Sequence, residues 1–286
     1  MYEDSRTVIS EEASEGDLES DRDASAGRAA HWTLAALSLA TPLLIPMESY
    51  PAGAAVFLCG VILLTRVPEQ LRLRLSILFG AVLLLAIAPV NTERSNEHFL
   101  VLGSFFAVVV FVPTILLRHQ PGAIEWRFWP RQFQWLDVFY VAISIPIAWG
   151  VLRWYFFVAT PELAENWPMP DEFSQEARWR LFFGINAVGI WDELFFVNTV
   201  YGIMRSCFPK RVANVAQAVV YTAVLNDMAF TGVGPIVVYA FALTQGAMYE
   251  RSRCLLYVLI VHLIVDAFLV FAILQYHYPD HTFPLF

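Results

Sequence analysis

The sequence predicts an all-α fold: a polytopic integral membrane helical bundle of about eight or nine transmembrane helices, preceded by a disordered acidic N-terminal tail. Hydrophobic residues make up 58% of the 286 positions, and charged residues only 15%. An average soluble domain has roughly 25% charged residues. Apolar runs of transmembrane length also recur along the chain, since a hydrocarbon core of about 30 Å requires roughly 20 apolar residues in a helix. We therefore expect the lipid bilayer to be the environment and partner of this chain.

The first 30 residues differ in kind from the rest. They hold nine acidic residues against three arginines, and Tyr2 is their only aromatic residue. A segment with so little apolar surface cannot offset the entropy lost on ordering. We predict that residues 1–30 form a disordered, cytosolic tail.

Nine apolar runs follow the tail and define the predicted spans. They lie at about 32–48, 51–65, 75–90, 99–117, 135–158, 179–206, 212–230, 234–249 and 254–275. The second and eighth runs are short and could instead be re-entrant. Because nearly all intramembrane ionisable groups fall in the later runs, we divide the bundle into N-terminal transmembrane helices, 31–134, and a C-terminal core, 135–286.

Basic residues predict the orientation, because cytoplasmic loops accumulate Lys and Arg. Nine alternating spans place 14 of the 18 basic residues on one side, and only Arg94, Arg178 and Arg180 on the other, with Arg153 inside a span. We expect a multi-pass plasma membrane protein with its N-terminus in the cytosol and its C-terminus outside.

Two classes of partner are disfavoured by composition. The three cysteines are scattered and form no metal-binding pair. Lys210 is the only lysine, and no basic run with interleaved aromatic residues suggests a nucleic-acid surface. We predict no nucleic-acid partner and no cofactor. Zinc is disfavoured because it needs three or four ligands, whereas the spans offer one imidazole plus carboxylates.

The chemistry is predicted to lie in the later spans. Asp192 and Glu193 fall near the middle of 179–206, where each carboxylate costs about 2.5–3.5 kcal/mol. His262 and Asp266 are one helical turn apart in 254–275, and Asn226 lies in 212–230. The helical rise places these residues about 12 to 21 Å from the cytoplasmic ends of their spans. Similar depths allow one shared site.

Other intramembrane polar residues have a simpler interpretation. Side-chain amides and hydroxyls join helices through hydrogen bonds of about 0.6–2 kcal/mol. We assign this packing role to Asn186, Gln217, Thr222 and Gln245.

The first and third polar groups resemble motifs of the CAAX protease and bacteriocin-processing (CPBP) family of intramembrane endopeptidases. The family's first motif is a Glu-Glu pair, three residues, then Arg. Asp192 and Glu193 match the pair, while Val197 stands at the Arg position. The third motif, His followed four residues later by Asn or Asp, is met by His262 and Asp266.

The second motif departs from the pattern. The family has Phe, three residues, then His. In this chain Thr222 and Asn226 stand at those two positions. The resemblance covers about residues 180–275.

The resemblance implies a glutamate-type mechanism in which a carboxylate activates water. Carried onto this chain, Asp192 would be the base, with Asn226 orienting the water at the second-motif position. His262 and Asp266 would stabilise the developing oxyanion, and Glu193 would be the second carboxylate. The substrate would be a membrane-associated protein or peptide, cut near the cytoplasmic half of the bilayer.

Two other functions fit the residues. A family member that has lost catalysis could keep the cavity as a membrane binding or scaffold protein, as the changes at Val197 and Asn226 suggest. A proton-coupled transporter could also use buried Asp, Glu and His as a relay, although no internal repeat supports it.

Overall fold

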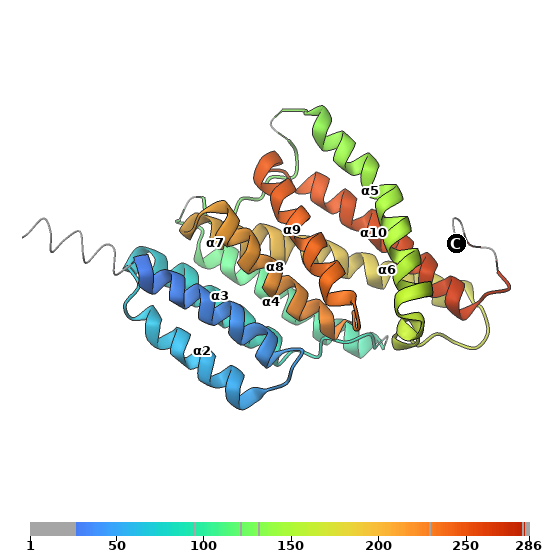
Figure 1. Cartoon of the computed structure of the whole chain (residues 1–286), viewed down its shortest axis with the longest axis horizontal. Helices are drawn as coiled ribbons and strands as arrows, with labels where there is room; N and C mark the ends of the chain where they lie inside the picture. The colour runs from blue at the N-terminus through green and yellow to red at the C-terminus, as the bar shows by residue number, and fades with distance from the viewer. Residues whose placement is uncertain are drawn as a thin grey trace, which may run out of the picture.

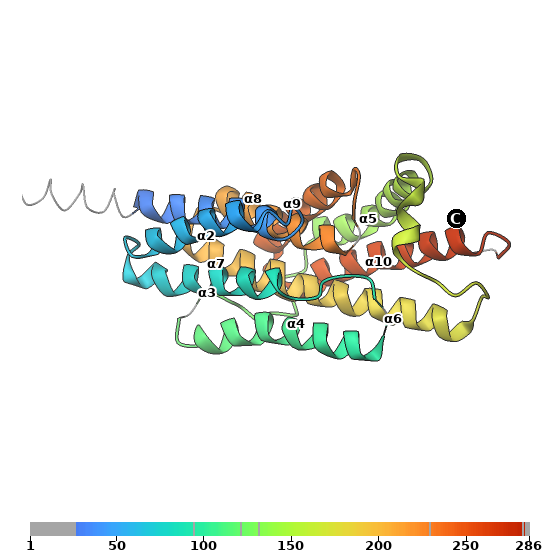
Figure 2. The same cartoon turned by 90° about the horizontal axis from the view of Figure 1, so that it is seen from below.

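The computed structural model describes residues 27–93, 95–120, 122–130, 132–228, 230–281 and 283. Within these ranges every regular element is a helix and no strand occurs, which confirms the all-α prediction. Figures 1 and 2 show the helices packed side by side in an elongated bundle.

The helices follow one another with short connections. A helix over residues 27–44 precedes α2 (Tyr50–Leu64), α3 (Glu69–Ala86), α4 (Asn96–Leu116), and α5 (Trp135–Trp154), which is continued by η1 (Tyr155–Ala159). After η2 (Pro161–Asn166), α6 (Gln175–Asp192), η3 (Glu193–Tyr201) and α7 (Gly202–Cys207) form one continuous rod. The chain then forms α8 (Lys210–Asp227), α9 (Gly234–Ser252) and α10 (Leu255–His277).

The structure describes only four residues of the predicted tail. Residues 27–30 are helical, and residues 1–26 lie outside the described residues. The disorder of the tail therefore stays a prediction, as do the domain boundaries at residues 30 and 134.

Four helical segments are long and apolar enough to cross a membrane. They are Asn96–Leu116, Trp135–Ala159, Gln175–Cys207 and Leu255–His277. The chain is thus an integral membrane protein whose environment is a lipid bilayer. The larger number of eight or nine spans stays a prediction, because the other described helices are shorter, as α2 is, carry more charge, as α3 does with Glu69, Arg72 and Arg74, or are less apolar.

Helix starts in this bundle are fixed by local capping. Ser95 precedes α4 and its hydroxyl accepts the His98 N–H at 3.1 Å. Ser174 precedes α6 and accepts the Ala177 N–H at 3.1 Å. Each cap satisfies a backbone donor that has no partner within the helix, so α4 and α6 begin at defined positions beside each other.

Contacts between connections divide the bundle into two ends. At one end, the Arg74 guanidinium donates to the Ser206 carbonyl at 3.4 Å, and the Leu255 N–H donates to the Arg127 carbonyl at 2.9 Å. We call this end the basic face; its described basic residues are Arg28, Arg66, Arg72, Arg74, Arg118, Arg127, Arg205, Lys210, Arg211, Arg251 and Arg253.

The opposite end is acidic. There the Thr92 hydroxyl donates to the Asn166 carbonyl at 2.6 Å, and the Tyr155 hydroxyl donates to the Thr231 carbonyl at 2.7 Å. We call it the acidic face; its exposed acidic residues include Glu93, Glu97, Glu162, Glu165, Asp171, Glu172 and Glu176. The basic and acidic residues named here therefore gather at opposite ends of the bundle.

Candidate active site within the helical bundle

The rod formed by α6, η3 and α7 changes its helical winding at the two predicted carboxylates. Asp192 is the last residue of α6, and Glu193 is the first residue of η3, a π-helix. The Thr199 hydroxyl donates to the Leu194 carbonyl at 2.9 Å within this wide turn. Such π-helical insertions are rare and occur frequently at functional sites. Here the insertion begins inside the longest candidate span, with Asp192 and Glu193 only 2% and 0% exposed.

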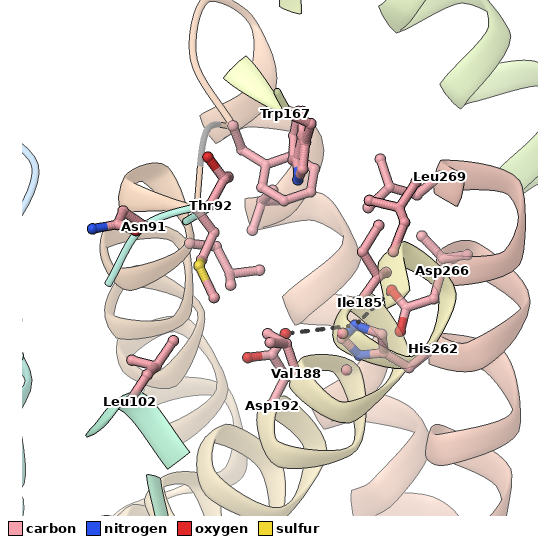
Figure 3. A pocket seen from close by; sticks show the side chains of 18 of the residues that line it. Asn91, Thr92, Leu102, Trp167, Ile185, Val188, Asp192, His262, Asp266 and Leu269 are labelled. Carbon is pink, nitrogen blue, oxygen red and sulfur yellow. Dashed lines mark ion pairs between the residues drawn. The ribbon is translucent and has the colours of Figure 1, made fainter. Parts of the chain in front are cut away.

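Three carboxylates surround one imidazole. His262 Nδ1 lies 2.7 Å from Glu193 Oε1, while His262 Nε2 lies 3.6 Å from Asp192 Oδ2 and 3.6 Å from Asp266 Oδ1. Figure 3 shows Asp192 of α6 and Asp266 of α10 pointing toward the ring of His262, which is also on α10. The structure therefore brings together Asp192, Glu193, His262 and Asp266, which we call the acid–imidazole cluster.

Two further side chains complete the cluster. The Gln245 amide donates to Glu193 Oε1 at 2.8 Å and to the Val258 carbonyl at 2.9 Å. The Tyr221 hydroxyl lies 3.2 Å from His262 Nδ1. Both residues are fully buried. The sequence analysis assigned Gln245 to helix packing and did not single out Tyr221; the only signal in the sequence was a polar group inside an apolar run.

Close approach of α10 to α6 depends on Gly189. A Cβ atom built on Gly189 would overlap the Asp266 carboxylate and would come within 2.9 Å of the His262 ring. Only a residue without a side chain fits between these groups. Gly189 therefore sets how closely the first and third motifs can meet.

At the second-motif segment, the neighbour of Asn226 faces the cavity. Leu225 lines the cavity beside the cluster, and Tyr221 reaches His262 from one turn earlier on α8. Asn226 is half-buried and is not among the described residues that line this cavity. The role predicted for Asn226 stays untested.

The position of the family's Arg is apolar. Val197 is fully buried, and the adjacent Asn198 accepts a hydrogen bond from the Tyr249 hydroxyl at 2.9 Å. Besides His262, the described side chain that contacts Glu193 is the neutral amide of Gln245.

A cavity of about 140 Å³ adjoins the cluster. Asp192, His262 and Asp266 line one end, and Asn91 and Thr92 line the other (Figure 3). Glu93 also lines that other end. The wall along α6 is a helical stripe of Leu181, Gly184, Ile185, Val188, Gly189 and Asp192. Most of the lining is apolar, and its polar groups lie toward the two ends. This arrangement is typical of ligand sites.

Several carboxylate oxygens of the cluster remain free to act on a ligand. Asp192 Oδ1, Glu193 Oε2 and Asp266 Oδ2 are buried and accept no hydrogen bond from the described part of the chain. Buried polar atoms are normally hydrogen-bonded. A water molecule or a polar substrate group could satisfy the free oxygens of Asp192 and Asp266 at the cavity end.

The described residues contain no group of three or more His, Cys, Asp or Glu side chains that could hold a metal ion. The prediction that the chain uses no cofactor stays a prediction.

Comparison with known families agrees with this geometry. Residues 174–268 match the family model described as type II CAAX prenyl endopeptidase Rce1-like. A search of curated proteins and a search of solved structures gave no match. The matched segment runs from the start of α6 into α10 and includes the whole acid–imidazole cluster. The match confirms the resemblance to the CPBP family.

Proposed function

We propose that this chain is an intramembrane endopeptidase that hydrolyses a peptide bond of a membrane-associated protein or peptide. The observation that carries the proposal is the convergence of three carboxylates on His262 at the end of an apolar cavity, inside the segment that matches an endopeptidase family.

In the proposed reaction Asp192 is the general base. Its free Oδ1 atom takes a proton from a water molecule in the cavity, and the resulting hydroxide attacks the carbonyl carbon of the scissile bond. The C–N bond then breaks as the carboxyl group of Asp192 returns the proton to the leaving amine. The products are one carboxylic acid and one amine, which then ionise to a carboxylate and an ammonium group, so atoms and protons balance.

His262 and Asp266 supply the stabilisation of the oxyanion. The Glu193 carboxylate beside Nδ1 favours the doubly protonated imidazolium, which leaves Nε2–H as a donor toward the cavity. A protonated Asp266 can donate a second hydrogen bond from the same wall. Fixed donors in a dry site stabilise developing negative charge well because they need no reorganisation.

Glu193 acts as a positioning residue in this scheme. It is fully buried, and its Oε1 atom is held by both His262 Nδ1 and the Gln245 amide. These contacts orient the imidazole so that Nε2 faces Asp192 and Asp266.

The test is hydrolysis by the purified full-length chain in lipid nanodiscs, supplied with a library of membrane-inserting peptides in water enriched in ¹⁸O. Incorporation of ¹⁸O into a new C-terminal carboxylate, detected by mass spectrometry, supports the proposal. Intact peptides throughout the library contradict it.

A second candidate function is a binding or scaffold protein that retains the cavity without catalysis. Two apolar residues favour this alternative. Val197 stands at the position of the family's Arg, and Leu225 precedes the position of the family's His. It predicts a membrane protein partner that co-purifies with the chain and is retained when Asp192 is replaced by Asn.

We also propose that the basic face is cytosolic and that the chain lies in the plasma membrane. The concentration of arginines at one end of the bundle supports this orientation.

A further inference from the structure

We propose that the substrate enters the bundle from the acidic face, as an extended polypeptide segment that is apolar inside the cavity and positively charged outside it. This inference rests on the proposed function, and it names the side of entry and the class of substrate.

The first argument is the direction of the cavity. Along α6 its wall runs from Arg180, at the acidic face, to Asp192. Ile185 and Val188 lie between them and are labelled with Asp192 in Figure 3. Asn91 and Glu93, which line the outer end, are exposed. The Asp192, His262 and Asp266 side chains at the inner end are at most 5% exposed. The described lining therefore leads from the acidic face to the cluster.

The second argument is the closure of the opposite side. Between the cluster and the basic face, η3 contributes Phe195, Phe196 and Val197, which are all fully buried. The ring of Phe196 packs against Tyr221 of α8 with centroids 4.3 Å apart. This apolar layer separates the cluster from the basic face.

The third argument is the length and chemistry of the passage. Twelve positions of α6 separate Arg180 from Asp192, which corresponds to about 18 Å of helix. An extended chain of about five residues spans that distance. At the outer half, His98 is 7% exposed and lines the cavity, and its Nε2 atom has no hydrogen-bond partner in the described residues. A peptide carbonyl or amide passing this point would satisfy that nitrogen.

The fourth argument is the charge around the opening. Glu93 lines the outer end, and the connection that carries Glu162 and Glu165 is tied to it by the hydrogen bond from Thr92 to Asn166. These carboxylates are exposed. Arg180 also lines the outer end, where its guanidinium donates to Asn96 Oδ1 at 2.7 Å. The three carboxylates outnumber this guanidinium, so they attract positively charged residues that flank the apolar segment and repel acidic ones.

The distribution of basic residues places the acidic face away from the cytosol. The substrate would therefore enter the cavity from outside the cell. The sequence-based expectation of cleavage near the cytoplasmic half concerns the depth of the cluster and stays a prediction.

Cysteine accessibility tests the side of entry without requiring catalysis. In a chain whose Cys59, Cys207 and Cys254 are replaced by Ser, we compare Ile185→Cys in the cavity with Ser206→Cys at the basic face. A membrane-impermeant maleimide should label Ile185→Cys in intact cells and Ser206→Cys only after permeabilisation. Labelling of Ile185→Cys only after permeabilisation, or not at all, overturns the proposed entry.

Peptide binding tests the substrate class in a chain that retains its cysteines. The Asp192→Asn variant in nanodiscs is titrated with fluorescent apolar peptides flanked by Lys, by Gln or by Glu. The Lys-flanked peptide should bind about 5-fold more tightly than the Gln-flanked one at low salt, and this difference should disappear at high salt and in Glu162→Gln/Glu165→Gln.

Equal binding of all three peptides, or displacement of bound peptide by a fatty acid at equal concentration, overturns the class assignment in favour of a lipid-binding cavity. Neither readout depends on hydrolysis. A chain that binds the Lys-flanked peptide from outside but never cleaves it therefore contradicts only the proposed function.

Discussion

Glu193 and His262 form the shortest contact of the buried cluster, with 2.7 Å between Oε1 and Nδ1. This contact fixes one nitrogen of the imidazole on the protein side and leaves the other, Nε2, between Asp192 and Asp266 at the cavity. The two consecutive carboxylates, Asp192 and Glu193, therefore face different nitrogens of the same ring. One carboxylate is available to a substrate, and the other holds the ring in place.

Replacement of Asp192 by Asn should lower the rate of peptide cleavage by about 10²- to 10⁴-fold, because an amide cannot accept the proton of water at this position. The matched control is Asp192→Glu, which retains the carboxylate and should keep most of the activity. Peptide cleavage is measured in nanodiscs by mass spectrometry for each variant. Equal rates for Asp192→Asn and the unsubstituted chain would contradict the assignment of the base.

Replacement of Gln245 by Leu should destabilise the fold by about 1–3 kcal/mol, since it removes the amide donor that holds the buried Glu193 carboxylate. Gln217→Leu is the control. Gln217 is also fully buried, but both of its polar side-chain atoms lack hydrogen-bond partners among the described residues. Thermal unfolding in detergent should show a loss for Gln245→Leu and no loss for Gln217→Leu. Equal losses would mean that the hydrogen bond to Glu193 contributes nothing specific.

The sequence was sufficient to predict the helical class and the four members of the cluster. Different signals identified the two pairs of residues in the cluster. His262 and Asp266 lie four residues apart, and a helix places such a pair on one face whatever its neighbours are. Asp192 and Glu193 were identified by the cost of placing carboxylates in lipid. These signals are local in the chain.

Other features depend on how helices meet, and no local pattern encodes them. Gln245 contacts Glu193 across 52 positions of sequence, so its role is visible only once α9 lies beside η3. The direction of the cavity depends on α4, α6, α9 and α10 together.

Replacement of Gly189 by Ala should destabilise the fold by about 1–3 kcal/mol and reduce activity, because the added methyl group would displace the Asp266 carboxylate. Gly103→Ala on α4 is the control, since a Cβ atom there meets nothing within 4 Å. Alanine at a helix interior position such as Gly103 should stabilise by about 0.5–1 kcal/mol. Thermal unfolding of both variants distinguishes crowding at the cluster from a general effect of removing glycine.

Acidification should destabilise the fold at the basic face, because Glu250 loses its negative charge when it is protonated. Burial raises the pKa of Glu250, but hydrogen bonds from Tyr201 and Arg205 and the charge of Arg253 outweigh burial, so the pKa lies below its ordinary value. A lowered pKa in the folded state means that Glu250 contributes stability above its ordinary pKa, and that this contribution is lost as pH falls through the folded value. The midpoint temperature of thermal unfolding should therefore decrease as the pH is lowered from about 5 to about 3.

Glu250→Gln should unfold at a lower temperature than the unsubstituted chain at neutral pH and should lose less stability on acidification. Glu172→Gln, at an exposed site on the acidic face, serves as the control and should keep the full dependence. If Glu250→Gln keeps the same acid-induced loss as the unsubstituted chain, other carboxylates are responsible.

A histidine at position 225 should increase the rate of cleavage, whereas a histidine at position 226 should not. The family's second motif supplies an imidazole that assists the base. In the structure Leu225 lines the same cavity as Asp192, while Asn226 is absent from the described lining. The Leu225→His imidazole could accept a proton from water together with Asp192, and a positioned acid or base group contributes up to about 10²- to 10⁴-fold. Initial cleavage rates of Leu225→His and Asn226→His, each compared with the same variant carrying Asp192→Asn, measure the effect. A larger gain for Asn226→His would show that α8 presents position 226 to the substrate.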